Sequence, residues 1–424
     1  MDHYLALLKR EMREAMGCTE PAASALAGAK AAELLGSPVS TLEVTTSRDM
    51  VKNAMGVGLP NCSLKGIQAA VALGACGGDA QAGLSILSVL NDEQIQCASS
   101  MPVALTLAHD IPPLYIRVKA FGSEGRSAVA VISGEHDRFS YLEKNGAVLL
   151  DLPVDACGST LESEDEQFIG TVSLSEILAW VDGAPHEALE LARWARKTNM
   201  AIAEHGMTHP YGLSVGMVAA QGIGGVGTLQ EAFAQGSAMA AAASDARMAG
   251  CPLAVVINSG SGNQGITLTV PLAVVGSFLG VGDDALHRSM LVAQLVGLSL
   301  TARKNRLSAL CGAFTAAIGT ACGYVHLLGG GVEEMDRAFN TMVGNLTGII
   351  CDGAKGTCAL KIHSCADAAA LAAKLAMHGL SPSSESGIVG KSSSESRDFL
   401  ERISREGMEE IDKTILSIMM GKHA

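Results

Sequence analysis

The chain has 424 residues, of which 48% are hydrophobic and only 17% are charged, and its formal net charge is -13. Such a length exceeds that of a usual single core, and a composition rich in small residues, with 48 glycines, excludes a disordered protein. The negative charge and the lack of a Lys/Arg-rich run argue against binding to nucleic acid or to an anionic membrane surface.

The first 40 residues predict two helices. Residues 2–16 are amphipathic and stop at Gly17, and a second helix begins near Thr19, which can cap it, with Glu20 in its first turn. Cys18 lies in the junction between these helices. Because the amphipathic pattern lacks the basic and then apolar order of a secretory signal, it favours a cytoplasmic protein.

From residue 41 the pattern becomes that of an α/β module, which we expect to span residues 41–184. Residues 41–47 alternate as in a strand, and residues 65–90 are rich in Ala and Gly as in a helix. Three apolar runs between residues 113 and 155 are separated by turn residues, which predicts an antiparallel meander.

After Ser173 the chain is almost wholly helical in pattern, with favourable helix starts at Ser173 and Pro185. The predicted fold class is therefore α+β: a mostly helical domain formed by 1–40 and 185–424, with the smaller α/β module and its antiparallel sheet inserted. The Ser/Gly-rich residues 381–396 predict a loop, either a linker or a flap over a site.

Two long stretches without charged side chains, 248–282 and 307–332, have the length of a membrane span. Prolines, amides and glycines interrupt the apolar surface of these stretches. Both are therefore predicted to be buried core helices.

Eleven cysteines are spread singly along the chain, which favours buried thiols and a metal site in a reducing compartment over a disulfide framework. Cys18 at a helix N-terminus has the arrangement that lowers a thiol pKa, although a small buried cysteine is the simpler interpretation. Three others, Cys311, Cys351 and Cys358, are either cluster ligands or unrelated buried thiols, since their spacing matches no zinc finger or compact ferredoxin run. The remaining cysteines are predicted to be core or surface thiols: Cys62, Cys76, Cys97, Cys157, Cys251, Cys322 and Cys365.

A Gly- and Ser-rich run at 258–265 comes directly before an apolar stretch that looks helical. Glycines let backbone N–H groups point at a ligand, and a helix N-terminus adds partial positive charge, so the run suits a carboxylate or phosphate. A plain turn between helices is the alternative. Asp245 and Arg247, just ahead of the run, are either an ion pair or substrate contacts. The candidate ligand-binding residues of the run are Ser259, Gly260, Ser261, Gly262, Asn263 and Gln264.

Six ordered motifs together resemble the UPF0597 family, the bacterial and archaeal L-cysteine desulfidases, which is itself similar to the iron–sulfur L-serine dehydratases. The motifs are Gly-Cys-Thr-Glu-Pro (17–21), Met-Val-Lys-Asn-Ala-Met-Gly-Val (50–57), Ala-Ser-Asp-Ala-Arg-Met (243–248), Asn-Ser-Gly-Ser-Gly-Asn-Gln-Gly (258–265), Arg-Leu-Ser-Ala-Leu-Cys (306–311) and Cys-Asp-Gly-Ala-Lys (351–355).

The resemblance implies an oxygen-sensitive 4Fe-4S cluster held by Cys311, Cys351 and Cys358, with one iron open to the substrate and no need for pyridoxal phosphate. It implies a carbon–sulfur lyase that converts L-cysteine to pyruvate, ammonia and sulfide. The alternatives are the corresponding elimination on L-serine, by an ammonia-forming carbon–oxygen lyase, and a non-catalytic amino-acid-binding or redox-sensing cluster protein.

The same resemblance maps the substrate-handling thiol or base onto Cys18 and carboxylate binding onto 259–264. It places Lys52 and Asn53 at the same cleft. A homodimer is expected, because closed two-fold oligomers are the commonest kind.

Overall fold

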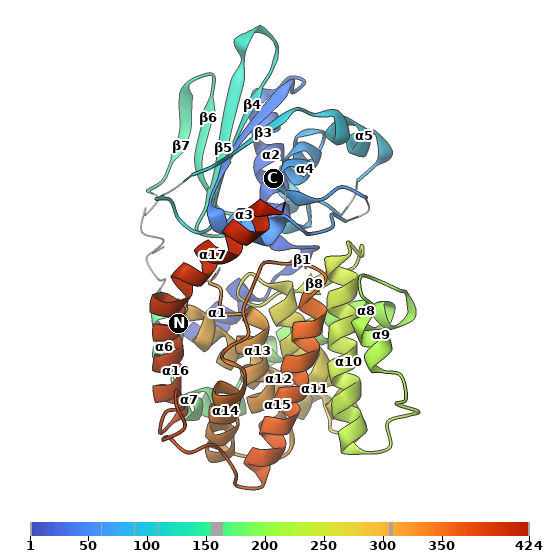
Figure 1. Cartoon of the computed structure of the whole chain (residues 1–424), viewed down its shortest axis with the longest axis vertical. Coiled ribbons are helices and arrows are strands. Elements are labelled where there is room, and N and C mark those ends of the chain that lie inside the picture. Colours follow the sequence, from blue (N-terminus) through green and yellow to red (C-terminus); the bar gives the residue numbers. More distant parts are fainter. Residues whose placement is uncertain are drawn as a thin grey trace.

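The computed structural model forms two units stacked along the long axis of the molecule, a sheet-containing unit above and a helical unit below (Figure 1). The structure describes residues 2–60, 62–88, 90–108, 110–153, 164–304 and 308–422. The predicted α+β class is confirmed. Cys157 and Arg306, which the sequence analysis singled out, lie outside the described residues.

The upper unit is built on one mixed sheet in the order β3-β2-β4-β5-β6-β7. The predicted antiparallel meander is present as β4 to β7. Two strands of this sheet were not predicted. The three predicted runs correspond to β4, β5 and β7, and β6 lies between the last two. Strand β3 pairs in parallel with β2, which requires the long helical connection between them. The strands are β2 (Thr41–Thr46), β3 (Val103–Leu107), β4 (Tyr115–Phe121), β5 (Ser127–Ser133), β6 (Phe139–Lys144) and β7 (Ala147–Asp151).

Four helices accompany this sheet: α2 (Thr19–Leu35), α3 (Arg48–Ala54), α4 (Gly66–Ala75) and α5 (Asp92–Ser100). Helix α2 packs on β4, β5 and α4. A Cβ atom at Gly74 would lie 1.9 Å from the Ala25 carbonyl oxygen, so α2 and α4 approach more closely than any side chain at this position allows. The helix predicted over 65–90 ends at Ala75, and only a 3-10 segment (Ala80–Ser85) follows. Gly77 at φ 128° turns the chain there.

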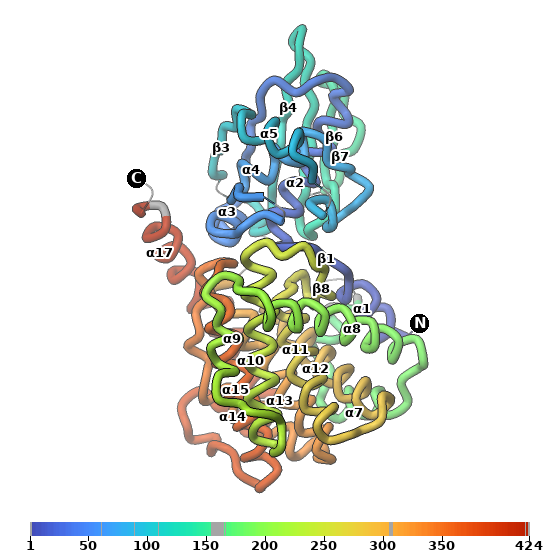
Figure 2. Tube along the Cα trace, turned by 90° about the vertical axis from the view of Figure 1, so that its right-hand side faces the viewer, coloured from blue at the N-terminus to red at the C-terminus, as the bar shows by residue number. Residues whose placement is uncertain are grey.

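The lower unit is a helix bundle in which α10 packs on α8, α11 and α15, and α13 packs on α12, α14 and α15 (Figure 2). Ser173 and Pro185 are the N-caps of α7 and α8, as predicted. The helices are α1 (His3–Glu11), α6 (Glu164–Thr171), α7 (Leu174–Asp182), α8 (His186–Thr208), α9 (Val215–Ala219), α10 (Leu229–Met248), α11 (Gly262–Leu279), α12 (Asp283–Arg303), α13 (Gly312–Leu327), α14 (Val332–Leu346), α15 (Cys358–Met377), α16 (Ser393–Arg402) and α17 (Met408–Gly421), with a π-helical turn at Ile403–Gly407.

Two features lie where the units meet. The predicted helix over 2–16 ends at Glu11, and residues Glu14–Met16 instead form β1, which pairs antiparallel with β8 (Ala254–Val256). The sequence pattern missed β1 because its partner is far away along the chain. Helix α17 then leaves the bundle and packs on α3 of the upper unit (Figure 1).

The predicted domain boundaries at 40 and 184 stay a prediction. Helix α2 packs on the sheet although it lies within 1–40, and α6 and α7 pack on α12 although they lie within 41–184. We therefore propose that the helical domain consists of 2–16 and 164–422 and the α/β module of 18–153.

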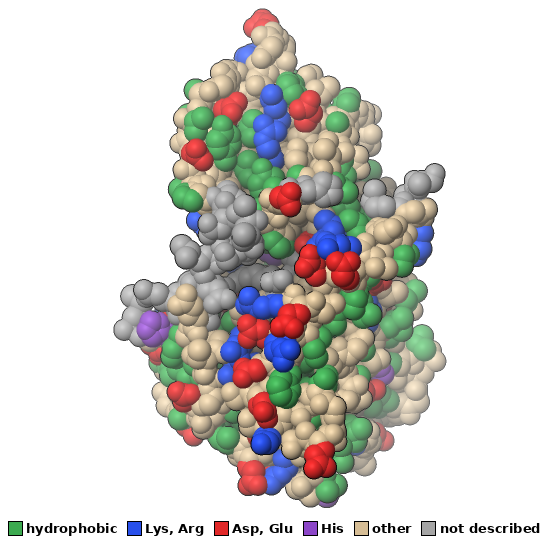
Figure 3. Space-filling view, turned by 60° about the vertical axis from the view of Figure 1, so that its left-hand side comes forward, with side chains coloured by type: hydrophobic (Ala, Val, Ile, Leu, Met, Phe, Trp, Pro, Cys, Tyr) green, Lys and Arg blue, Asp and Glu red, His purple; other side chains and the backbone are tan. Residues whose placement is uncertain are grey.

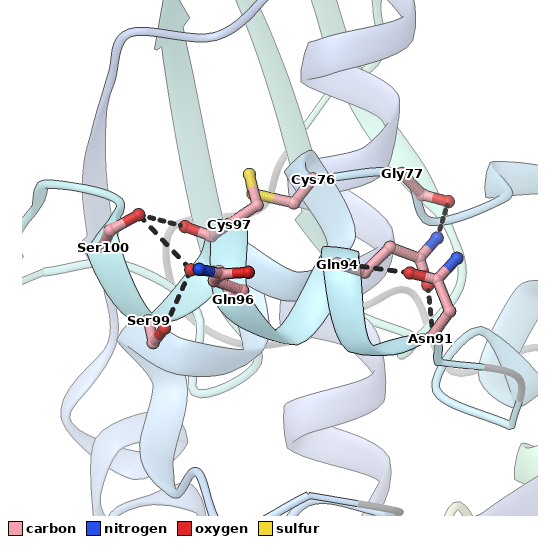
Figure 4. The surroundings of a disulfide bond; sticks show 8 residues. All are labelled: Cys76, Gly77, Asn91, Gln94, Gln96, Cys97, Ser99 and Ser100. Atoms are coloured by element: carbon pink, nitrogen blue, oxygen red, sulfur yellow. Dashed lines mark hydrogen bonds between the residues drawn. A yellow bond between two sulfur atoms is a disulfide. The ribbon is translucent and has the colours of Figure 1, made fainter.

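Cys76 and Cys97, predicted to be thiols, are joined by a disulfide (Figure 4). Cys76 caps the C-terminus of α4 and Cys97 lies in α5, and their Cα atoms are 6.0 Å apart. Nearby, the Gln94 side chain donates to the Gly77 carbonyl over 2.8 Å, which holds the end of α4 against α5. The sequence pattern could not show this proximity, since it depends on how the two helices pack.

The prediction of buried core helices is confirmed for α11, which covers the second half of the first uncharged stretch, and for α13, which covers most of the second stretch. The first half of the stretch 248–282 instead contains β8 and the Gly- and Ser-rich segment. Among the described helices, none is both long and apolar enough to cross a membrane.

Charges of both signs are interspersed on the face drawn in Figure 3, where blue and red side chains alternate over the helical unit. The helical unit also contains ion pairs: Arg303 lies 3.0 Å from Glu401 and Arg337 lies 3.0 Å from Glu334.

Replacing Gly74 by Ala should lower the free energy of unfolding by about 1–3 kcal/mol, because the added methyl group meets a backbone carbonyl that cannot rotate away. Chemical denaturation measures the change. Gly348→Ala is the control, because its Cβ meets no atom within 4 Å. An unchanged midpoint for Gly74→Ala would contradict the close approach of α2 and α4.

Candidate active site

A cavity lies where the two units meet, with an empty volume of about 800 Å³ including its open mouth. Its walls come from the start of α2, from α3, from the loop between β5 and β6, from the segment before α11, and from the segments around α13 and α15. The polar and sulfur-bearing residues that line it are Cys18, Thr19, Glu20, Asn53, His136, Arg247, Ser259, Ser261, Asn263, Gln264, Lys304, Ser308, Cys311, Cys351, Cys358 and Lys361.

Glu20, only 7% exposed, is the centre of one wall. Its Oε2 accepts hydrogen bonds from the Cys18 thiol at 2.9 Å and the Thr19 hydroxyl at 3.2 Å, and its Oε1 accepts from Asn53 Nδ2 at 3.0 Å. His136 Nε2 lies 3.9 Å from Oε1, a distance that suits a charge interaction and is too long for a hydrogen bond. Several donors thus compensate the burial of this carboxylate.

Burial by itself raises the pKa of Glu20. The facing His136 and the Cys18 thiol together lower the pKa by a larger amount, so it lies well below the usual range of a carboxyl. Glu20 is therefore an anion at neutral pH. Its charge holds both thiol and amide donors in place.

Cys18 is the N-cap of α2 and is 3% exposed. Burial, and next the negative charge of Glu20, raise the pKa of this thiol well above its usual value. This environment agrees with the simpler interpretation of a small buried cysteine. The alternative, a thiolate favoured by the helix N-terminus, is not supported, because desolvation and the neighbouring carboxylate outweigh the helix dipole. The single Thr19 hydroxyl proton lies between Glu20 Oε2 and the Gly260 carbonyl, which is the closer acceptor at 2.8 Å, and this contact ties the start of α2 to the segment before α11.

The Gly- and Ser-rich segment leads into α11, as predicted, with Ser261 as the N-cap that accepts from Gln264 N. Ser259 and Gly260 both have positive φ, at 51° and 76°. The Ser259 hydroxyl donates to Asn258 Oδ1 over 2.8 Å. The predicted residues 259, 260, 261, 263 and 264 line the cavity, whereas Gly262 lies behind them.

Arg247 lies over the first turn of α11. Its Nη1 donates to Asn263 Oδ1 over 3.1 Å, and a Cβ at Gly262 would lie 2.4 Å from its Nε, so only glycine leaves room for the guanidinium. Asp245 instead accepts from the Gly216 N–H over 3.2 Å. Both residues are described, and they do not form the ion pair that the sequence left open.

The three cysteines of the cluster hypothesis line the other side of the same cavity. Leu310 and Ile350 form an isolated antiparallel bridge, in which the Cys311 N–H donates to Ile349 and the Cys351 N–H to Ala309. This bridge holds Cys311, the N-cap of α13, beside Cys351.

Cys358 starts α15, and its sulfur accepts from Lys355 N over 3.5 Å. Hydrogen bonding between the thiols of Cys311 and Cys351 raises the pKa of Cys311 and lowers that of Cys351. The positive charges of Lys304 and Lys361 face these sulfurs. Cysteine thiolates are the usual ligands of iron–sulfur clusters, and these three cysteines share one cavity with the two lysines.

The described part of the chain contains no group of three His, Cys, Asp or Glu side chains already arranged to hold a metal ion. The three thiols fit a cluster in chemical type and in the cavity that they share.

Asn53 lines the cavity as expected, whereas Lys52 does not. Lys52 is fully buried and pairs with Asp412 of α17. Its role in this structure is to connect α3 to α17, and its charge also lowers the pKa of Cys351.

Sequence reasoning missed several lining residues. The sequence pattern gave Glu20 and Thr19 structural roles only, in the first turn and at the cap of a helix. Both belong to the motif that contains Cys18. His136 and Lys304 carry no sequence signal, because they reach the cavity only through the fold. Ser308 and Lys361 were also missed, although each is near a cluster cysteine in the chain.

Comparison with known proteins identifies the family to which the chain belongs. Residues 81–417 match the family model described as serine dehydratase alpha chain. A UPF0597 protein of Oleidesulfovibrio alaskensis is 39% identical over 424 residues, covering 99% of this chain and 98% of that protein. UPF0597 proteins of Aeromonas salmonicida and Parabacteroides distasonis are 35% and 36% identical, covering 99% and 98% of this chain and 96% and 97% of those proteins. The chain belongs to the serine dehydratase alpha chain family.

The resemblance to UPF0597 proteins is thereby confirmed over nearly the whole chain. Membership of the serine dehydratase alpha chain family indicates a lyase-type enzyme with a small-molecule substrate, and it suggests an iron–sulfur cluster. The cavity that contains both the cysteines and the segment before α11 is the candidate active site of this family member.

The raised pKa of Cys18 is measurable by thiolate absorbance at 240 nm. The difference between the wild type and Cys18→Ser should show no absorbance step below about pH 9, because the buried thiol stays protonated below its raised pKa. A step near neutral pH would contradict the assigned environment of Cys18.

Proposed function

We propose that this protein is an L-cysteine desulfidase, which eliminates sulfide from L-cysteine with the help of a 4Fe-4S cluster and yields pyruvate and ammonia. The observation that supports this most strongly is that one cavity is lined by Cys311, Cys351 and Cys358 and also by the anion-binding segment and Cys18. Family membership supports a related lyase.

The N-terminal end of α11 is the proposed site for the substrate carboxylate. The first N–H groups of a helix lack intrahelical acceptors, and the dipole adds partial positive charge there. Ser259, Ser261 and Asn263 place further polar groups on the same wall. These donors hold the substrate at a fixed distance from the sulfur-rich wall.

Cys311, Cys351 and Cys358 are the proposed cluster ligands. When bound, the cluster would supply a Lewis-acid iron that stabilises the departing thiolate. Lys304 and Lys361 compensate negative charge on the ligand sulfurs, and Lys304 is kept in place by its hydrogen bond to the Leu310 carbonyl at 3.1 Å.

Cys18 is the proposed acceptor of the substrate α-proton. Its thiol is protonated before substrate binds, so it must first release its own proton. The thiol donates to Glu20 Oε2 over 2.9 Å, but the pKa of Glu20 lies well below its usual range, so this carboxylate does not keep the proton. The proton passes to solvent through the open mouth of the cavity, and the thiolate then accepts the α-proton.

Elimination from L-serine is the second candidate, and the name of the matching family model favours it. In that reaction hydroxide leaves in place of sulfide. A non-catalytic sensor predicts cluster signals that respond to amino acids without turnover. Anaerobic assays of pyruvate from both substrates, with sulfide from L-cysteine, separate the three. The proposal predicts the higher kcat/KM for L-cysteine, and a higher kcat/KM for L-serine would overturn this choice.

The proposal includes a cytoplasmic location, because an oxygen-sensitive cluster is suited to a reducing compartment. The Cys76–Cys97 disulfide instead favours an oxidising compartment, since disulfides persist in oxidising environments. A homodimer is part of the proposal on general grounds only.

Alanine substitution of any one of Cys311, Cys351 and Cys358 should remove most of the iron from anaerobically reconstituted protein, because each thiolate is one of only three protein ligands. Iron and acid-labile sulfide content measure this directly. Cys322→Ala is the matched control, because Cys322 is also buried but lies in α13 away from the cavity lining. Full iron content in all three cavity variants would exclude the proposed ligand set.

Cys18→Ser should keep its iron and lose about 10²- to 10⁴-fold in kcat, which is the usual contribution of a positioned proton acceptor. Steady-state kinetics with the reconstituted enzyme tests this. Full activity in a variant that retains the cluster would remove Cys18 from the mechanism.

A further inference from the structure

Three buried polar atoms of cavity-lining residues lack hydrogen-bond partners: Asn53 Oδ1, His136 Nε2 and Arg247 Nε. The three residues are 6%, 5% and 3% exposed. Unpaired buried polar atoms are costly, so their presence indicates a ligand that pairs with them. Asn53 Oδ1 is an acceptor and Arg247 Nε is a donor, so a ligand that pairs with both must carry groups of both kinds.

The orientation of the Asn53 amide follows from Glu20. An ionised carboxylate only accepts hydrogen bonds, so the Asn53 NH₂ group must face Glu20 Oε1, which it does at 3.0 Å. Its Oδ1 is then left as an acceptor without a partner. The negative charge of Glu20 lies one hydrogen bond behind this oxygen, which favours a cationic donor over a neutral one.

The surroundings of Arg247 have the opposite character. The guanidinium lies over the first turn of α11, where Gly262 leaves room for it, so a full positive charge adds to the positive end of the helix dipole. Within the described residues, the side-chain partner of Arg247 is the neutral amide oxygen of Asn263. The guanidinium of Arg247 and the N-terminus of α11 therefore both favour a bound anion at this position.

We propose that Asn53 and Arg247 together recognise the two charged groups of an α-amino acid. Asn53 Oδ1 accepts a hydrogen bond from the α-ammonium group, and Arg247 Nε donates to the α-carboxylate. Glu20 is a positioning residue that fixes the Asn53 amide and adds charge behind it. This inference rests on the proposed function and deepens it, because it limits the substrates to α-amino acids and disfavours 2-hydroxy acids and simple carboxylates.

The test uses ligands that have no β-leaving group and therefore do not react. L-Alanine carries both charged groups, L-lactate carries a hydroxyl in place of the ammonium, and propionate carries the carboxylate alone. Isothermal titration of the full-length protein, reconstituted under anaerobic conditions, measures each dissociation constant. The wild type should bind L-alanine at least about tenfold more tightly than L-lactate, because hydrogen bonds to charged groups have this magnitude.

Asn53→Leu should abolish the preference for L-alanine over L-lactate, because it keeps the volume and removes the acceptor. Asn53→Asp keeps an acceptor and should retain the preference. Asn345→Leu, at an exposed position of α14, is the matched control and should behave as the wild type.

Glu20→Gln should reduce the preference for L-alanine over L-lactate, because a glutamine can donate to Asn53 and release the fixed amide orientation. Arg247→Leu should weaken the binding of all three ligands.

Equal binding of L-alanine and L-lactate by the wild type would overturn the proposal, and so would an undiminished preference in Asn53→Leu. If Asn53→Leu does not fold, loss of the preference in the soluble Asn53→Asp variant would count against the proposal, and its retention would support it. A wild type that shows the preference but eliminates neither sulfide nor water would leave the recognition intact and refute the proposed reaction. Turnover in a protein whose preference is unchanged by Asn53→Leu would support the proposed reaction and refute the proposed recognition.

Discussion

Burial of the Glu20 carboxylate is the constraint on which the site depends. A charge that is 7% exposed must be surrounded by donors, and Glu20 draws these from different parts of the fold. Cys18 and Thr19 donate from the same turn and Asn53 donates from α3, while His136, from the loop after β5, lies 3.9 Å from the carboxylate without a hydrogen bond. The charge therefore holds several walls of the cavity together, and each of those walls contributes a candidate functional group.

The sulfur-bearing wall is held by different interactions. The bridge between Leu310 and Ile350 keeps the segment before α13 beside the segment after α14. The pair formed by Lys52 and Asp412 holds α17 against α3 close to this wall, and Asp412 also accepts from the Ala309 N–H at 3.0 Å. The α/β unit and the helical unit are thus connected at the cavity itself, so their relative position bears directly on the site.

Sequence patterns predicted the features that depend on local periodicity and capping. The α+β class, the meander β4 to β7, the starts of α7 and α8, and the helix after the Ser/Gly-rich segment all belong to this group, because each is specified by residues close together in the chain. The motif-based resemblance also identified the family, which the comparisons confirm.

What the sequence could not predict depends on contacts between distant segments. Strand β1 forms only against β8, and the Cys76–Cys97 disulfide forms only because α4 and α5 pack together. The sequence left the state of Cys18 open, because the helix N-terminus is visible in the sequence whereas the burial beside Glu20, which raises the pKa of the thiol, is not. His136 enters the site through a loop of the sheet, which no local pattern relates to the helical unit.

The central claim is that one cavity holds a cluster with an iron open to an amino acid. Mössbauer spectroscopy of protein reconstituted with ⁵⁷Fe tests this most directly. The account predicts that one iron of the cluster has a signal of its own and that L-cysteine changes this signal while the others stay the same. Equivalent irons that do not respond to the amino acid would contradict the account.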